Sequence, residues 1–287
     1  IWATTNAVNV TDGLDGLAAG SALMGFGAFA LIGAYVSAIL VVKSGWSFWI
    51  SLPAAGLFAA MVSIIIGIPI LRLRGVYFAM ITLVLTQVVT LTALALPITN
   101  GARGMSSIPL PSGVSLFGIP ILPDFAGMEN TKLAFYYTAC ILMIVTYAAL
   151  YRLVNSRLGH LCRSMQQNEE LASSIGVNIA YIRVVIFAIS SFFGGIGGAM
   201  FGSIAQSVYP SSFQVVDSVN FMLNCFLGGL GYVFGPMLGT LVLYFGWDLL
   251  FEFGKYQMLI YSTVLILIIR FLPNGLLSLR ANKGNDK

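Results

Sequence analysis

The chain has 287 residues, of which 58% are hydrophobic and only 8% are charged, with a formal net charge of +4 and a mean hydropathy of +0.92. A soluble domain averages about 25% charged residues, so 14 basic and 10 acidic side chains are too few to cover a 30.7 kDa protein in water. This composition excludes a soluble enzyme, a disordered chain and a nucleic-acid-binding protein. It predicts an all-α polytopic membrane protein, because helices satisfy their own backbone groups in lipid.

Residues 1–19 form a predicted cytoplasmic segment that is unusually polar for this chain. Asn9, Asp12 and Asp15 offer oxygen atoms of the kind that bind Mg²⁺, although a simple turn would also explain them. Residues 1–35 resemble the signature segment of phospho-N-acetylmuramoyl-pentapeptide transferase, a Mg²⁺-dependent membrane enzyme. The resemblance implies a nucleotide and Mg²⁺ site at these three residues.

A complete transferase is not expected from the rest of the sequence. The resembling family has a histidine-rich cytoplasmic loop, whereas His160 is the only histidine here. We therefore interpret the N-terminus as chimeric or truncated, and keep a transferase fragment or fusion as the alternative function. Three separated cysteines, Cys140, Cys162 and Cys225, form no CxxC pair, and the sequence predicts neither a metal site nor a cofactor in this chain.

Apolar runs between charged residues predict about eight spans, since a helix needs about 20 apolar residues to cross the hydrocarbon core. The predicted spans are 20–41, 47–71, 75–96, 133–151, 184–206, 212–228, 235–251 and 257–272. Together they form one transmembrane domain over residues 20–279, followed by a cytoplasmic tail at 280–287. The boundaries within 212–251 are the least defined, because Asp217, Asn224 and several glycines interrupt the apolar pattern.

Basic residues orient the predicted spans. Ten would lie on the cytoplasmic side and four outside, in agreement with the positive-inside rule, with both termini in the cytoplasm. The ten are Arg72, Arg74, Arg152, Arg157, Arg163, Arg183, Arg270, Arg280, Lys283 and Lys287, and the four are Lys43, Arg103, Lys132 and Lys255. Residues 97–132, which are rich in proline and glycine, then become an external loop over the bundle.

Residues 152–183 are the only long polar stretch, and they lie on the cytoplasmic side. Asn168 suits a helix N-cap, Glu169 and Glu170 suit a first turn, and Gly176 suits a stop, so a short helix is predicted from Asn168. Leu171, Ala172 and Ile175 are expected on one face of that helix. The stretch is either a solvated connector or a docking helix for a partner protein.

Several motifs resemble the permeases of branched-chain amino acid (LIV-type) ABC transporters. They comprise Arg72–Ala79, Ser156–Asn178, Leu227–Pro236 and Arg270–Leu277, within a similarity that runs from about Gly27 to Leu279. The family implies an inner-membrane importer of branched-chain or related amino acids. Its parts are two permease subunits, two cytosolic ATPases that hydrolyse ATP, and a periplasmic or extracellular binding protein. The permease itself would have no catalytic site.

The same resemblance places Glu169, Glu170, Ala172 and Gly176 in the loop that couples the membrane domain to the ATPases. This loop is a degenerate version of the family's usual glutamate-alanine-alanine pattern, with Ser173 where a second small residue is common. Asn220 stands where many relatives carry an acidic residue.

The second half of the chain holds candidates for the substrate path or for gating. Polar residues within spans are functional candidates, and a broken helix at membrane depth lies where it is buried or lines a cavity. The candidates are Asp217, Asn220, Asn224, Gly228, Gly229 and Gly231. An interfacial helix end is an alternative place for Asp217. The glycines Gly194, Gly195, Gly197, Gly198 and Gly202 predict close helix packing.

Overall fold

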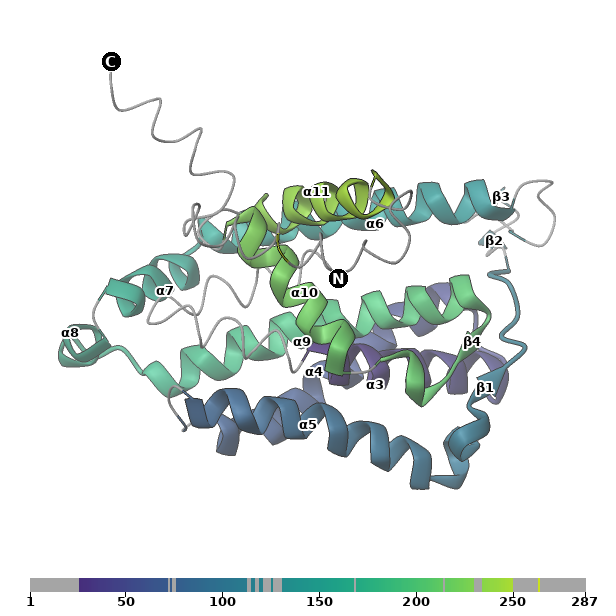
Figure 1. Cartoon of the computed structure of the whole chain (residues 1–287), viewed down its shortest axis with the longest axis horizontal. Helices are drawn as coiled ribbons and strands as arrows, with labels where there is room; N and C mark the ends of the chain where they lie inside the picture. Colours follow the sequence, from purple (N-terminus) through teal and green to yellow (C-terminus); the bar gives the residue numbers. More distant parts are fainter. Residues whose placement is uncertain are drawn as a thin grey trace, which may run out of the picture.

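The structure is a computed structural model that describes residues 26–71, 73, 76–112, 115–116, 119–120, 125, 131–167, 169–213, 215–229, 234–249 and 263. The α-helices are α3 (Phe26–Val42), α4 (Phe48–Ile70), α5 (Val76–Ala95), α6 (Thr131–Val154), α7 (Arg157–Gln167), α8 (Glu169–Ser174), α9 (Ile179–Ala205), α10 (Val215–Gly228) and α11 (Gly235–Leu249). The strands are β1 (Met105–Ser106), β2 (Ser115–Leu116), β3 (Ile119–Pro120) and β4 (Ser207–Val208), and the 3₁₀ turns are Pro97–Thr99, Gly101–Arg103 and Pro210–Ser212. The fold class is all-α, as predicted, and the long helices lie alongside one another (Figure 1).

The predicted spans can be compared with these helices one by one. Each of the first seven overlaps a helix, while 257–272 lies outside the described residues except for Thr263. Within the described part of the chain, α4, α6 and α9 are long and apolar enough to cross a membrane, and α5 with the following 3₁₀ turns could form a fourth span bent by 79°. The protein is therefore a multi-pass membrane protein, and the count of eight spans stays a prediction.

Helices α3, α4 and α9 form the tightly packed centre of the bundle. A Cβ atom added to Gly33 of α3 would collide with the backbone of Gly195 in α9, and one added to Gly198 would collide with the backbone of Ala30. Such close approach between membrane helices requires small residues and supplies van der Waals contact in place of a hydrophobic driving force. The prediction of close packing is confirmed for Gly195 and Gly198.

Helices α3 and α4 are also joined by a buried polar contact. The hydroxyl groups of Ser37 and Ser51 lie 3.0 Å apart and form a hydrogen bond within the bundle. The Ser51 side chain is fully buried, so this bond satisfies a polar group that would otherwise be costly in an apolar interior.

The two ends of the bundle carry different elements (Figure 1). At the end that carries α7 and α8, called here the α8 end, lie Arg152, Arg157, Arg163 and Arg183, whereas Lys43, Arg103 and Lys132 lie at the opposite end, called the loop end. The topology predicted from the sequence places the α8 end in the cytoplasm.

Contacts between distant segments close the loop end. Strands β1 and β4 pair antiparallel, with Met105 opposite Val208, and the Lys43 ammonium donates a hydrogen bond to the carbonyl oxygen of Ile98 at 2.8 Å. Phe125 is fully buried, with its ring 4.9 Å from that of Phe135 in α6. The described part of the predicted external loop is thus packed onto the bundle.

Candidate functional site

The polar stretch after α6 folds into two helices at the α8 end. Helix α8 begins at Glu169, as predicted, whereas α7 was not predicted. The spacing of Leu158, Cys162 and Met165 carried the signal for α7, because residues four and three apart share one helix face. The sequence interpretation missed this signal because it treated 152–168 as a polar connector.

Helices α7 and α8 are fixed to the start of α9 by an apolar cluster. The cluster contains Cys162 and Met165 of α7, Ala172 of α8, and Ile182 and Ile186 of α9, all of them buried. Residues 157–186 include the positions that are expected from the sequence to couple to a partner, and they are called here the coupling segment. They form a packed unit and not a loose connector.

Gly176 lies just beyond the last residue of α8 and stops the helix, as the sequence predicts. Gly176 has φ +87°, its amide donates to the Ser173 carbonyl at 3.0 Å, and the Val177 amide donates to the Ala172 carbonyl at 3.1 Å. These two hydrogen bonds define a Schellman motif, in which a glycine takes the left-handed conformation just beyond the helix. Gly176 thus sets the direction in which the chain leaves α8.

The outward face of the coupling segment is apolar. Leu171 is 66% exposed, Ile175 is 78% exposed and Tyr181 is 64% exposed. The expectation that Ala172 shares this face is wrong, because Ala172 is only 2% exposed and packs toward α7 and α9. Adjacent helix positions are about 100° apart, so Ala172 turns inward when Leu171 and Ile175 point outward.

Helix α7 carries polar side chains on its surface. Arg157, His160 and Arg163 are all exposed along one side of this helix. The backbones of Glu169 and Glu170 lie in the first turn of α8, and their side chains lie outside the described residues.

The start of α9 connects the coupling segment to α4. The Asn178 side chain caps α9 by accepting a hydrogen bond from the Tyr181 amide at 3.1 Å, as N-cap residues do. One turn later, the Arg183 guanidinium donates to the carbonyl oxygen of Leu71, the C-cap of α4, at 3.5 Å. A cation at this end of α4 also opposes the negative end of the helix dipole.

Cys162 should react slowly with thiol reagents in the folded protein. Its side chain is 1% exposed, and burial raises the pKa of the thiol to about 11. Only the thiolate reacts, and an ordinary cysteine has a pKa of about 8.5, so at pH 8 we expect alkylation at least about 100-fold slower than for a free thiol. The rate should rise with pH up to about 11. Maleimide labelling of a variant that keeps only Cys162 would measure this.

The control for this prediction is the same variant unfolded in detergent, where Cys162 should label at the ordinary rate. Equal labelling rates in the folded and unfolded protein would show that α7 is not docked on α9.

Helices α10 and α11 form a tight hairpin that holds most of the predicted path residues. They have 14 and 15 residues, or about 21–22 Å at 1.5 Å per residue, which is shorter than the hydrocarbon core. A Cβ atom on Gly228 would collide with the backbone of Gly235, and one on Gly239 with the carbonyl of Asn224. Gly229 has φ +104° and ends α10.

The structure brings some of the path candidates together and separates others. Asn220, Asn224 and Gly228 follow one another at turn spacing on α10; Asn220 is exposed and Asn224 is half-buried. The backbone of Asp217 lies in the first turn of α10, its side chain lies outside the described residues, and so does the whole of Gly231.

Ser218 is a buried polar residue that sequence reasoning missed. It is fully buried, and its hydroxyl has no hydrogen-bond partner among the described residues. The hydroxyl lies against Gly27 of α3, close to Thr86 of α5. An unpaired buried hydroxyl is unfavourable and unusual. No sequence pattern distinguishes Ser218 from other serines. Its burial became apparent only from the packing of α10 against α3 and α5.

The transferase-like residues Asn9, Asp12 and Asp15 lie outside the described residues. Within the described ranges, no group of three or more histidine, cysteine, aspartate or glutamate residues is placed to hold a metal ion.

Comparisons with known proteins agree over most of the chain. A family model described as the permease component of the branched-chain amino acid transport system matches residues 18–269. The high-affinity branched-chain amino acid transport system permease proteins LivM of Escherichia coli K12 and Salmonella typhimurium LT2 are each 32% identical over 286 aligned positions. Each alignment covers 94% of this chain and 66% of the relative.

A more distant similarity links the chain to a second kind of permease. The LivH permease protein of Salmonella typhimurium is 24% identical over 186 positions, covering 63% of this chain and 58% of LivH. For the two LivM relatives described above, the alignment with this chain spans just under two thirds of the relative's length. No solved structure matches. Nothing in these comparisons supports the transferase alternative.

Proposed function

This chain belongs to the branched-chain amino acid transport permease family, and from that membership we propose that it is a membrane-spanning subunit of an ABC importer. The cargo is a branched-chain or related amino acid. The partners are a second permease, two cytosolic ATPases that hydrolyse ATP, and a periplasmic or extracellular binding protein. The membrane is the bacterial cytoplasmic membrane, and the chain itself carries no cofactor and catalyses no reaction.

The exposed apolar face of the coupling segment is the observation that carries this proposal. Leu171 and Ile175 project from a segment whose helices pack against each other and against the start of α9. A small apolar face rimmed by polar side chains is typical of a helix that enters a groove on a partner protein. We assign that groove to the ATPase, with Glu169 and Glu170 at its edge.

Movement of the ATPase would reach the membrane helices through the start of α9. The apolar cluster ties α8 to Ile182 and Ile186, and Arg183 ties the same turn to the end of α4. One turn further on, Phe187 packs against Phe29 of α3, with ring centroids 5.3 Å apart. A displacement of α8 would thus act on α3, α4 and α9 together.

The proposed substrate path lies beside the α10–α11 hairpin. Short helices with polar residues and glycine breaks form the substrate sites of many transporters. Asp217, Asn220 and Asn224 supply the polar groups on α10, and Gly228, Gly229 and Gly231 supply the break. Buried Ser218 adds a hydroxyl where α10 meets α3 and α5.

Uptake of leucine into proteoliposomes tests the proposed function. The chain would be reconstituted with its partner permease, ATPases and binding protein, and radiolabelled leucine would be measured with and without ATP. Uptake is expected only when all components and ATP are present. Failure of the complete, correctly assembled complex to transport any branched-chain amino acid would contradict the proposed cargo.

The docking face is tested by replacing Leu171 and Ile175 with glutamate. Burying one such side chain contributes about 1.5–3 kcal/mol, so each change should weaken ATPase binding by about ten-fold or more. Leu171→Met and Ile175→Leu are the matched controls and should bind normally. Co-purification with the ATPase measures the effect. Full binding of both glutamate variants would place the ATPase contact elsewhere.

A further inference from the structure

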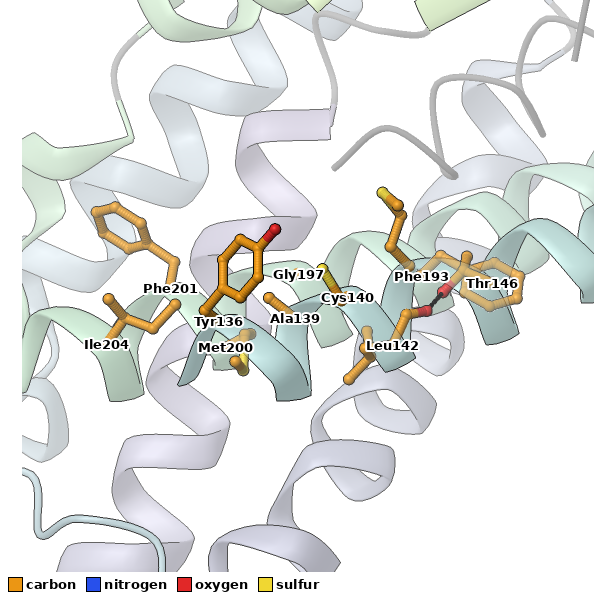
Figure 2. Close-up of a pocket in the computed structure, with 11 residues that line it drawn as sticks. Tyr136, Ala139, Cys140, Leu142, Thr146, Phe193, Gly197, Met200, Phe201 and Ile204 are labelled. Carbon is orange, nitrogen blue, oxygen red and sulfur yellow. Dashed lines mark hydrogen bonds between the residues drawn. The ribbon is translucent and has the colours of Figure 1, made fainter. Parts of the chain in front are cut away.

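A cavity of about 420 Å³ lies between α6 and α9 (Figure 2). Both helices are long and apolar enough to span a membrane. The residues around it are mostly aliphatic, aromatic or sulfur-containing, and they include Tyr136, Cys140, Met143 and Thr146 of α6 and Met200 and Ile204 of α9. Tyr136 and Ile204 are more than half exposed, so the cavity is open to the side and is called here the α6–α9 groove.

Packed side chains limit the groove at both ends. Toward the loop end, Phe135 of α6 packs against the buried ring of Phe125. Toward the α8 end, Leu150 of α6 packs with Phe193 of α9. The groove therefore extends from about residue 136 to residue 146 of α6, or about 15 Å along the helix. A further membrane helix, about 10 Å wide and 30 Å long, does not fit this short window.

The groove contains almost no free polar group. The Thr146 hydroxyl already donates to the Leu142 carbonyl at 2.6 Å, and the Tyr136 hydroxyl and the Cys140 thiol form a hydrogen bond with each other. None of the lining residues is charged. An amino acid carries two charges, and burying charges without partners is strongly unfavourable. The groove thus suits an apolar chain and not the proposed cargo.

A positive charge lies beside the mouth of the groove. Lys132 is exposed, and it precedes Tyr136 by four residues and Cys140 by eight, so the three share one face of α6. Its α-carbon therefore lies about 6 Å further toward the loop end than that of Tyr136, nearer the level of the lipid headgroups. An ammonium group there attracts an anionic phosphate by charge.

We propose that the α6–α9 groove binds one acyl chain of an anionic phospholipid whose headgroup is held by Lys132. Flexible Met143 and Met200 adapt to the chain, as methionine does in irregular apolar sites. Tyr136 lies between the apolar groove and the headgroup, an arrangement typical of tyrosine at the membrane interface. The site is independent of the cargo and of the ATPase.

Photo-crosslinking in vesicles tests this proposal. The full chain would be placed in phosphatidylcholine vesicles containing phosphatidylglycerol with a diazirine in its acyl chain, and the labelled peptides would be identified by mass spectrometry. Labels are expected to concentrate on residues 136–146 and 193–204. Ala139→Leu, which fills the groove, should remove most of this labelling. Ala148→Leu, at an exposed position on the same helix, should leave it unchanged.

Binding of the headgroup by Lys132 is tested by removing the charge of that side chain. Lys132→Gln should lower groove labelling by the phosphatidylglycerol probe about five-fold, the effect of one basic residue at an anionic surface. A phosphatidylcholine probe with the same acyl chain should respond little.

Three results would overturn the proposal. The first is labelling spread evenly over the exposed faces of α4 and α6 and insensitive to Ala139→Leu in a variant that still purifies as a single species. The second is equal labelling by both probes before and after Lys132→Gln. The third is loss of groove labelling on assembly with the partner permease, which would identify a protein as the occupant.

Discussion

Replacing Gly198 with leucine is expected to abolish the accumulation of folded protein. A Cβ atom at this position would overlap the backbone of Ala30, with the α-carbon of Ala30 only 2.8 Å away. Backbone atoms cannot rotate aside as a side chain can, so α3 and α9 would have to separate. Overpacking a core costs about 1–3 kcal/mol when side chains can adjust. Here the cost should exceed this range and approach the total stability of a protein, about 5–15 kcal/mol.

The measurement is the amount of monodisperse protein recovered from membranes. Gly198→Ala places the same Cβ atom against the backbone of Ala30, so it should also lose most of the folded protein, with leucine the more severe of the two. Gly246→Leu in α11 is the matched control, because a Cβ atom there meets no atom of the described residues within 4 Å. If Gly198→Leu accumulates and melts like the unchanged protein, α3 and α9 are not in contact at this point.

Replacing Gly176 with valine should uncouple ATP hydrolysis from transport without preventing membrane insertion. Gly176 has φ +87°, and among the described residues no atom lies within 4 Å of an added Cβ, so the substitution causes backbone strain and not a clash. A left-handed conformation costs an L-residue about 1–2 kcal/mol, too little to unfold the bundle. Relief of this strain would break the Schellman motif and redirect α8, so we expect transport per ATP to fall several-fold.

The experiment compares leucine transported with ATP hydrolysed in the reconstituted complex. Gly176→Asn should retain coupling, because asparagine tolerates the left-handed region. Gly45→Val is a second control, since Gly45 has φ +65° and open space at the opposite end of the bundle. If Gly176→Val transports the normal amount of leucine per ATP hydrolysed, the contact that couples the ATPase to transport lies outside residues 157–186. If Gly45→Val uncouples as strongly, strain alone is responsible.

The helical elements were largely predictable because their signals are local. The apolar runs give α4, α6 and α9 to within a few residues. Gly176 ends α8 as expected, because its effect depends only on its own backbone conformation. Helix α7 was predictable from its amphipathic spacing but was missed. The inward orientation of Ala172 was not predictable, since it depends on the packing of α8 against α7 and α9.

The candidate site was less predictable because it depends on contacts between distant segments. Asn220 and Asn224 were identified as intramembrane polar residues, but Ser218 differs from other serines only by its burial against Gly27. The α6–α9 groove forms between segments about 60 residues apart in the sequence, and no local pattern marks it.

The pairing of β1 with β4 has a consequence for the order in which the chain is made. Met105 leaves the ribosome about a hundred residues before its partner Val208, a delay of about 5–20 s at ordinary rates of translation. During that time α6 and α9 must enter the membrane while the first strand has no partner. The outer surface is thus completed late in biogenesis, and a ribosome that stalls before residue 208 would leave a membrane-inserted chain with an open, protease-sensitive exterior.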